Sequence, residues 1–95
     1  MTVNSIAALS VLSVRDQIGP RRRGAIYANA KGRFEVLALI TDPRKASALL
    51  GAAARWALIV RDTCHPQGEP YAIGTAWTTT DYLIRPGKTA FAQAA

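Results

Sequence analysis

The residues of this chain with the clearest chemical potential are its arginines. Nine of the twelve basic residues are arginine, and Arg21, Arg22 and Arg23 are consecutive. A guanidinium group stays charged and can donate two parallel hydrogen bonds to one phosphate, which a lysine does poorly. The arginines therefore indicate a surface that binds a polyanion. A solvated face without a partner remains the alternative, and a codon bias toward arginine also accounts for part of the composition.

The basic residues are unevenly distributed along the chain. The net charge is +6, and residues 1–50 contain eight basic against three acidic residues, whereas residues 51–95 contain four against three. Arg55 and Arg61 are six positions apart, and an even separation places two residues on the same face of a strand. We also expect Tyr27, Tyr71 and Tyr82 to be partly exposed and able to stack on unpaired bases. The predicted nucleic-acid-binding residues are Arg21, Arg22, Arg23, Lys31, Arg33, Arg55, Arg61, Arg85 and Tyr27.

Cys64 and His65 are the two residues that invite a catalytic interpretation. Neighbours on an extended loop point to opposite sides, which argues against a thiolate–imidazolium pair. One cysteine and one histidine are also too few for a metal site, which needs three or four ligands. We therefore predict no catalytic residue, no metal and no cofactor, and we expect that the protein is not an enzyme.

The hydrophobic pattern predicts a mainly β domain with one short helix. Asp42 and Pro43 are typical of a helix start and Gly51 of a helix end, which indicates a helix over 43–50. Asn29 to Gly32 suits a tight turn between two strands, and a single 3₁₀ turn is expected over 79–83. The predicted strands cover 24–29, 33–41, 55–62, 71–78 and 84–85.

Two strands supply most of the expected core. In the strand over 33–41 we expect Phe34, Val36, Ala38 and Ile40 on one face, with Leu37 and Leu39 on the other face beside Glu35. Apolar residues on both faces indicate a central or strongly coiled strand. In the strand over 55–62 we expect Trp56, Leu58 and Val60 on one face. Trp56 and Trp77 should both fill the core.

The order of these elements suits a small, curled antiparallel barrel of five strands. The stretches "GAIYANAKGRFEVLALI", "RWALIVRD" and "GTAWTTTDYLI" resemble those of small bacterial SH3-like domains over about residues 24–85. The resemblance implies an SH3-like barrel, with the helix over 43–50 as an insertion, and it favours binding of nucleic acid or protein. We divide the chain into an N-terminal arm (1–20, a short helix or a strand), the barrel domain (21–88) and a C-terminal tail (89–95).

Two functions remain open on this evidence. The first is a nucleic-acid-binding module, for RNA or DNA, that contacts phosphates with little sequence preference. The alternative is a protein-interaction or adaptor domain, or a small subunit of a larger assembly, including a homodimer that pairs through an exposed sheet edge or the arm. No apolar run is long enough for a membrane span, no signal peptide is evident and one cysteine forbids an internal disulfide, so we expect a cytoplasmic protein.

Overall fold

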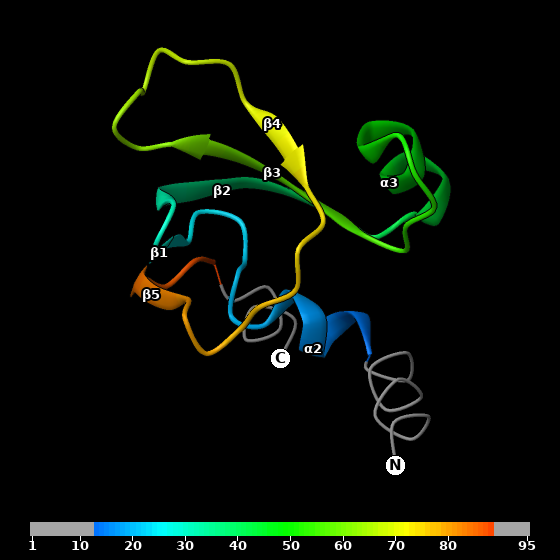
Figure 1. The fold of residues 1–95 in the computed structure, drawn as a ribbon, viewed down its shortest axis with the longest axis horizontal. Coiled ribbons are helices and arrows are strands. Elements are labelled where there is room, and N and C mark those ends of the chain that lie inside the picture. Colours follow the sequence, from blue (N-terminus) through cyan, green and yellow to red (C-terminus); the bar gives the residue numbers. More distant parts are fainter. Residues whose placement is uncertain (1–12, 89–95) are drawn as a thin grey trace.

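Helices and strands alternate unevenly along the chain in the computed structural model, which describes residues 13–88 (Figure 1). In this part of the chain two helices and five strands form. Their bounds are α2 Val14–Ile18, β1 Ile26–Asn29, β2 Gly32–Ile40, α3 Pro43–Leu50, β3 Ala57–Asp62, β4 Tyr71–Ile73 and β5 Tyr82–Arg85. The described part of the predicted arm is thus helical, while residues 1–12 and the predicted tail (89–95) lie outside the described residues.

The five strands form one antiparallel sheet in the order β4-β3-β2-β1-β5. The predicted mainly β fold with a five-stranded antiparallel sheet is therefore confirmed, and β2 is a central strand as expected. β4 and β5 lie at the two edges and do not pair with each other within residues 13–88. The sheet formed by these strands is consequently open, and the expected closure into a barrel is not shown.

Helix α3 begins and ends at the predicted residues. The Asp42 side chain accepts a hydrogen bond from the backbone N–H of Arg44, at 3.2 Å, and Pro43 occupies the first turn. Gly51 adopts a left-handed conformation (φ 70°), and its N–H donates to the carbonyl of Ser47. Both ends depend on short-range signals in the sequence, which explains why the prediction succeeds. In residues 13–88 no helix is long and apolar enough to cross a membrane.

Strand β2 contains an irregularity that the hydrophobic pattern did not reveal. The pairing with β3 shifts register between Val36 and Ala38, so Leu37 is an extra residue in the ladder. An extra residue moves every following side chain to the other face of the sheet. Leu39 therefore packs against the core together with Phe34 and Val36, and the predicted grouping of faces is wrong beyond Val36.

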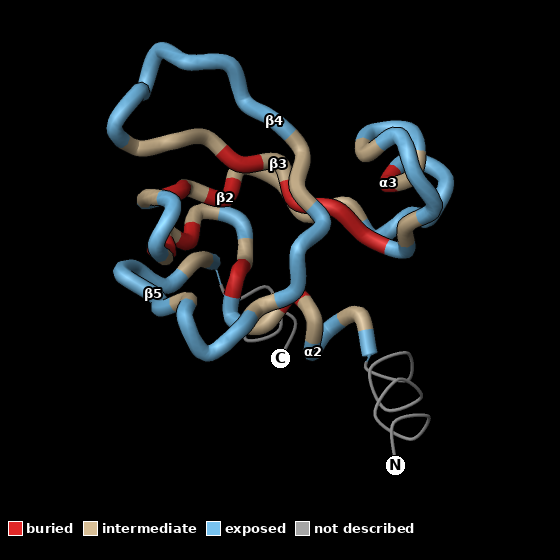
Figure 2. The backbone as a smooth tube through the Cα atoms, viewed as in Figure 1, coloured by how far each residue is buried: buried red, intermediate tan, exposed pale blue. Residues whose placement is uncertain are grey.

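The core lies on one face of the sheet, which we call the inner face. Buried residues gather in the middle of the sheet, whereas β5 is exposed along its length (Figure 2). Trp56 is buried as predicted, and Trp77 is partly buried against the same cluster. The buried cluster comprises Ile18, Ala25, Tyr27, Phe34, Val36, Trp56, Leu58 and Val60.

The chain leaves the sheet earlier than predicted after β4. The expected strand over 71–78 ends at Ile73, and residues 74–81 cross beside α2 on their way to β5 (Figure 1). The Trp77 N–H donates to the carbonyl of Gln17 at 2.7 Å instead of to a strand. A single 3₁₀ turn over 79–83 does not form, because the turn lies over 78–81, where the Asp81 N–H donates to the Thr78 carbonyl at 3.1 Å and the Asp81 carboxylate accepts from the Thr78 N–H at 2.7 Å. β5 consequently starts at Tyr82, two residues before the predicted strand.

Candidate nucleic-acid interface

Arg21, the first of the three consecutive arginines, is buried in the core. Only 1% of its surface is exposed, so the expectation that it contacts phosphates is wrong. Its Nε donates to the carbonyl of Ile18 at 2.9 Å, and its Nη2 donates to the carbonyls of Gln17 and Thr75, at 3.0 and 2.8 Å. These bonds replace the water that a buried guanidinium loses.

Three aromatic rings surround the same guanidinium. Its central carbon lies 5.3 Å from the ring centre of Tyr27 and 5.6 Å from those of Trp56 and Trp77. Rings at this distance attract a cation through their electron-rich faces, most strongly where water is excluded. We call Arg21 with these three rings the arginine cage. It holds α2, β1, the start of β3 and the crossing segment 74–81 together.

Tyr27 is part of the cage and not of the surface. It is 2% exposed, and its ring packs 5.5 Å from that of Phe34 and 5.9 Å from that of Trp77. Burial raises the pKa of Tyr27, and the neighbouring Arg21 charge and hydrogen bond oppose that rise. The expectation that Tyr27 stacks on a base at an exposed site is therefore wrong, because its ring faces the core on the inner face.

Arg22 and Arg23 have different environments from Arg21. Arg22 is half-buried, and its guanidinium donates to the carbonyls of Gly19 and Arg21. Arg23 is exposed, and its carbonyl accepts from the N–H of Lys88 at 2.9 Å. Of the three consecutive arginines, Arg21 is thus buried, Arg22 is half-buried and Arg23 is exposed. Arg23 therefore has the most accessible charge of the three.

Three of the predicted arginines share the face of the sheet opposite the core, which we call the outer face. In register across the sheet, Arg85 of β5 pairs with Ile26 of β1, Ile26 with Glu35 of β2, and Glu35 with Arg61 of β3. Arg33 lies two residues before Glu35 on β2 and therefore points to the same side. The strand pairing therefore brings together Arg33, Arg61 and Arg85, which are far apart in the sequence.

The outer face keeps a positive excess because it contains one carboxylate among three arginines. Arg85 forms an ion pair with Glu35 at 3.6 Å and also donates to the carbonyl of Gly24 at 2.8 Å. Arg33 and Arg61 form no ion pair with any residue of 13–88. The Nε of Arg61 is buried and has no hydrogen-bond partner there. Such an unpaired donor lowers stability, which suggests a role for Arg61 other than holding the fold.

Three of the other acidic residues serve local turns or a helix cap, and none of the three forms an ion pair with an outer arginine in residues 13–88. Asp42 caps α3, and Asp62 accepts from the N–H of Cys64 at 2.9 Å. Asp81 accepts from Asn29 and Thr78. Burial raises the pKa of Asp81, but these hydrogen bonds outweigh that effect and hold it below its ordinary value. These three carboxylates are thus committed to backbone and amide groups.

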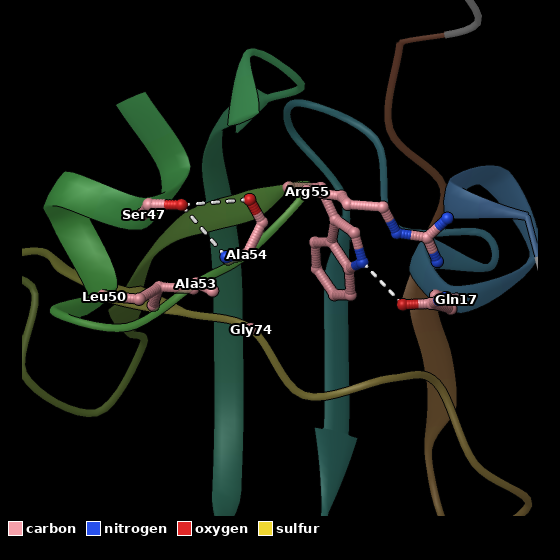
Figure 3. Close-up of a pocket in the computed structure, with 8 residues that line it drawn as sticks. Gln17, Ser47, Leu50, Ala53, Ala54, Arg55 and Gly74 are labelled. Carbon is pink, nitrogen blue, oxygen red and sulfur yellow. Dashed lines mark hydrogen bonds between the residues drawn. The ribbon is translucent and has the colours of Figure 1, made fainter. Parts of the chain in front are cut away.

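Lys31 and Arg55 lie away from the row of outer arginines. Lys31 is exposed in the turn between β1 and β2, beside Arg33. Arg55 precedes β3, which begins at Ala57, so the expectation that it shares a strand face with Arg61 is wrong. Arg55 lines a groove of about 490 Å³ between α2 and α3, and its side chain extends toward Gln17 (Figure 3).

Two exposed tyrosines were not among the predicted site residues. Tyr82 is 59% exposed and lies opposite Ala28 on the outer face, and Tyr71 is 45% exposed and lies opposite Val60 on the inner face. The exposure expected from their polar tips is therefore confirmed for Tyr71 and Tyr82, whereas it is wrong for Tyr27.

The Cys64–His65 pair gives no catalytic arrangement in the described part of the chain. Cys64 is exposed, and the Nδ1 of His65 lies 3.3 Å from Asp62 in an exposed loop. The Asp62 pKa is lowered mainly by the backbone hydrogen bond from Cys64. Among residues 13–88 no group of three or more potential metal ligands exists.

Comparison with known proteins identifies no relative. No family model matches the chain, and neither a curated protein nor a solved structure matches it significantly. Any functional conclusion therefore depends on the geometry of the outer face and its surroundings.

Proposed function

We propose that the protein is a nucleic-acid-binding module that contacts phosphates through the outer face of its sheet. The observation that carries this proposal is the strand register, which aligns Arg85 and Arg61 across four strands and adds Arg33 beside them. Within residues 13–88, Arg33 and Arg61 have no carboxylate partner, so their charges remain available to a ligand.

The geometry of the outer face suits the sugar-phosphate backbone of a nucleic acid. Adjacent strands are about 4.8 Å apart, so the three strand intervals between Arg85 and Arg61 span roughly 14 Å. A nucleic-acid backbone that crosses the strands can therefore place successive phosphates near successive arginines. Two more exposed basic residues, Arg23 and Lys88, lie near the end of β5, where the Lys88 N–H donates to the Arg23 carbonyl. Contacts of this kind neutralise phosphates and read no base sequence.

The proposal includes the SH3-like character of the domain. The return of β5 to the side of β1 leaves β4 and β5, the last two strands in the chain, as the two edges of the sheet. A curled sheet of this order needs these edges to approach in order to form a barrel. SH3-like barrels host many functions, so this likeness supports the nucleic-acid proposal by analogy alone.

The test compares two double variants with the same net charge. Arg33→Gln with Arg61→Gln removes two charges from the outer face, whereas Arg44→Gln with Lys45→Gln removes two exposed charges from α3. Binding to single- and double-stranded RNA and DNA is measured by fluorescence anisotropy over a salt series. We expect the outer-face variant to bind more weakly and to reduce the salt slope by about 2, since each phosphate contact contributes roughly 0.9 to the slope for duplex DNA.

The α3 variant is the control for net charge. It should retain nearly the full affinity and salt slope of the unmodified protein. Equal losses in the two variants would show that only net charge matters, and absence of binding even at low salt would refute the proposed function.

A second candidate function is self-association through β5. This edge strand exposes Tyr82, Leu83 and Ile84, at 59%, 36% and 42%, without a charged residue among them. Unprotected apolar edges pair readily with another strand, and an antiparallel pair of identical strands satisfies two-fold symmetry. A second copy of this chain is therefore the partner that fits. Light scattering should show a dimer that Leu83→Lys converts to a monomer, and a monomer at all concentrations would exclude this candidate.

A further inference from the structure

A small pocket opens on the inner face between the β1–β2 turn and β4. It has a volume of about 180 Å³ and is lined by three aromatic rings, those of Tyr27, Phe34 and Tyr71. Val60 and Ile73 complete its apolar wall, and Lys31 lies at its rim. Asn29 and Thr75 add polar groups to the lining, so the pocket has a mixed wall that is more apolar than polar and includes the positive charge of Lys31.

The three rings of the pocket come from β1, β2 and β4 and differ in their exposure to solvent. Tyr27 and Phe34 pack together in the core, with their ring centres 5.5 Å apart. Tyr71 projects from β4 opposite Val60 and remains 45% exposed. A tyrosine hydroxyl is neutral near pH 7 at its ordinary pKa of about 10, and burial raises the pKa of Tyr71 further. Tyr71 thus offers a ligand an uncharged aromatic surface at the pocket entrance.

The size and lining of the pocket select a narrow class of ligand. Pockets for drug-sized molecules usually exceed about 300 Å³, so this one has room for a single ring system. A flat aromatic group gains most from a site lined with aromatic rings. A nucleobase that has left the stack of a single strand has this shape, and aromatic side chains hold such bases with little sequence preference.

The surrounding charges indicate how the backbone of that strand would run. Lys31 lies in the turn next to Arg33, so the tip of the β1–β2 hairpin joins the pocket rim to the outer face. A neighbouring hollow of about 210 Å³ also touches Lys31, but the carboxylate residue Asp81 is part of its lining. That negative charge repels phosphate, whereas Arg33 attracts it. The favourable path therefore leads over the hairpin toward Arg33 and Arg61.

We propose that this pocket receives one unstacked base of a single-stranded nucleic acid while the adjoining phosphates cross the hairpin tip to the outer face. This inference rests on the proposed function and adds to it a preference for single strands. A base in a duplex is paired and stacked, so it cannot enter the pocket. Lys31 contacts the phosphate next to the inserted base, and Tyr71 covers the base from the β4 side.

The test uses a ten-nucleotide thymidine strand and an abasic strand with the same number of phosphates. Fluorescence anisotropy measures the affinity of the full chain for both strands and for a ten-base-pair duplex. We expect the unmodified protein to bind the thymidine strand about tenfold more tightly than the abasic strand, which corresponds to the contribution of one stacked base. Tyr71→Ala should reduce this ratio to less than about threefold, with an unchanged salt slope.

Two further variants test whether the pocket is the cause of the affinity ratio between the thymidine strand and the abasic strand. Tyr71→Phe keeps the ring and should retain the tenfold ratio. Tyr82→Ala removes a tyrosine that is more exposed than Tyr71 from the outer face and should leave the ratio unchanged. Retention of the ratio in Tyr71→Ala, or its loss in Tyr82→Ala, would overturn the pocket proposal while leaving phosphate binding intact. If neither the strands nor the duplex binds at low salt, the proposed function itself fails.

Discussion

The interior of the domain and its outer face both contain arginine, but they use it in opposite ways. Arg21 is buried, and three backbone carbonyls and three aromatic rings surround its guanidinium. Arg33 and Arg61 lie on the outer face and form no ion pair with residues 13–88. The interior guanidinium stabilises the fold, whereas the outer ones add charge that the fold itself does not need.

The difference shows that the surroundings of a guanidinium, and not its sequence context, determine its role. Moving a charge out of water is costly unless hydrogen bonds and nearby charges compensate. At Arg21 the carbonyls of α2 and of Thr75 provide this compensation, and the Asp81 charge interacts favourably with it at longer range. Among residues 13–88 no such partners are found for Arg61, and its Nε is buried without one. The four predictions below test this contrast.

The largest effect is expected from removing the interior arginine. Arg21→Ala removes the side-chain donor of the Ile18 and Thr75 carbonyls and one of the two donors of the Gln17 carbonyl. It also opens a cavity among Tyr27, Trp56 and Trp77, and together these losses should cost about 3–5 kcal/mol of unfolding free energy. A small domain has roughly 5–15 kcal/mol in total. Urea unfolding followed by tryptophan fluorescence measures the change.

Arg23→Ala is the matched control for Arg21→Ala, because Arg23 is exposed two positions away. Its effect should stay within about 0.5 kcal/mol, as for most surface substitutions. Similar losses in both variants would contradict the division between interior and surface arginines.

A smaller loss of stability is expected where the cage meets the end of α2. Gly19 has φ 65°, and a Cβ atom there would lie 2.7 Å from the Trp77 ring. Gly19→Ala therefore adds a clash with the cage to backbone strain, and we expect a loss of about 2–3 kcal/mol. Gly51 has a similar φ of 70° with no atom within 4 Å, so Gly51→Ala should lose only about 1 kcal/mol. Equal thermal shifts in the two variants would show that Trp77 moves aside freely.

Replacement of an outer arginine should separate stability from binding. Arg61→Met removes a buried donor that has no partner and keeps much of the apolar stem of the side chain. We expect the unfolding free energy to stay constant or to rise by up to about 1 kcal/mol, while the affinity for nucleic acid falls. Urea unfolding and anisotropy on the same sample test both changes. A destabilisation above about 1 kcal/mol would show that Arg61 also supports the fold.

The smallest effect is expected at the carboxylate of the outer face. The Glu35 and Arg85 side chains are 36% and 56% exposed, and an ion pair so accessible contributes at most about 1 kcal/mol. Glu35→Gln should therefore change stability little. It removes the negative charge among the outer arginines, so affinity for a single strand should rise about twofold at low salt. Weaker binding of this variant would indicate that Glu35 positions Arg85 for the ligand.

The predictable parts of this fold depend on short-range signals. Asp42, Pro43 and Gly51 mark the ends of α3 through hydrogen bonds that each span only a few residues. The turn before Gly32 joins β1 and β2 as expected, because Asn29 accepts from the Lys31 N–H at 2.9 Å. The alternation in β3 likewise identified Trp56, Leu58 and Val60 as core residues.

The unpredicted parts depend on contacts between distant residues. The extra residue Leu37 in β2 can be recognised only from its pairing with β3. The early end of β4 results from the attachment of Trp77 to Gln17, sixty positions apart in the chain. Of the predicted site, Arg33, Arg61 and Arg85 share one face, whereas Arg21 and Tyr27 are interior. No local pattern distinguishes an arginine that enters a core from its exposed neighbour.

The sequence by itself determined the class of the fold, the position of α3 and the excess of positive charge, because capping, turn chemistry and alternation act within a few residues. Only the tertiary structure decided which arginines face outward. The register of β5, β1, β2 and β3 aligns Arg85 with Arg61, and the crossing segment 74–81 brings Thr75 and Trp77 to Arg21. Some of these placements depend on contacts between residues far apart in the chain, such as Arg21 and Thr75, which are 54 positions apart. The burial of Arg21 also depends on the desolvation of its charge, which the local sequence does not reveal.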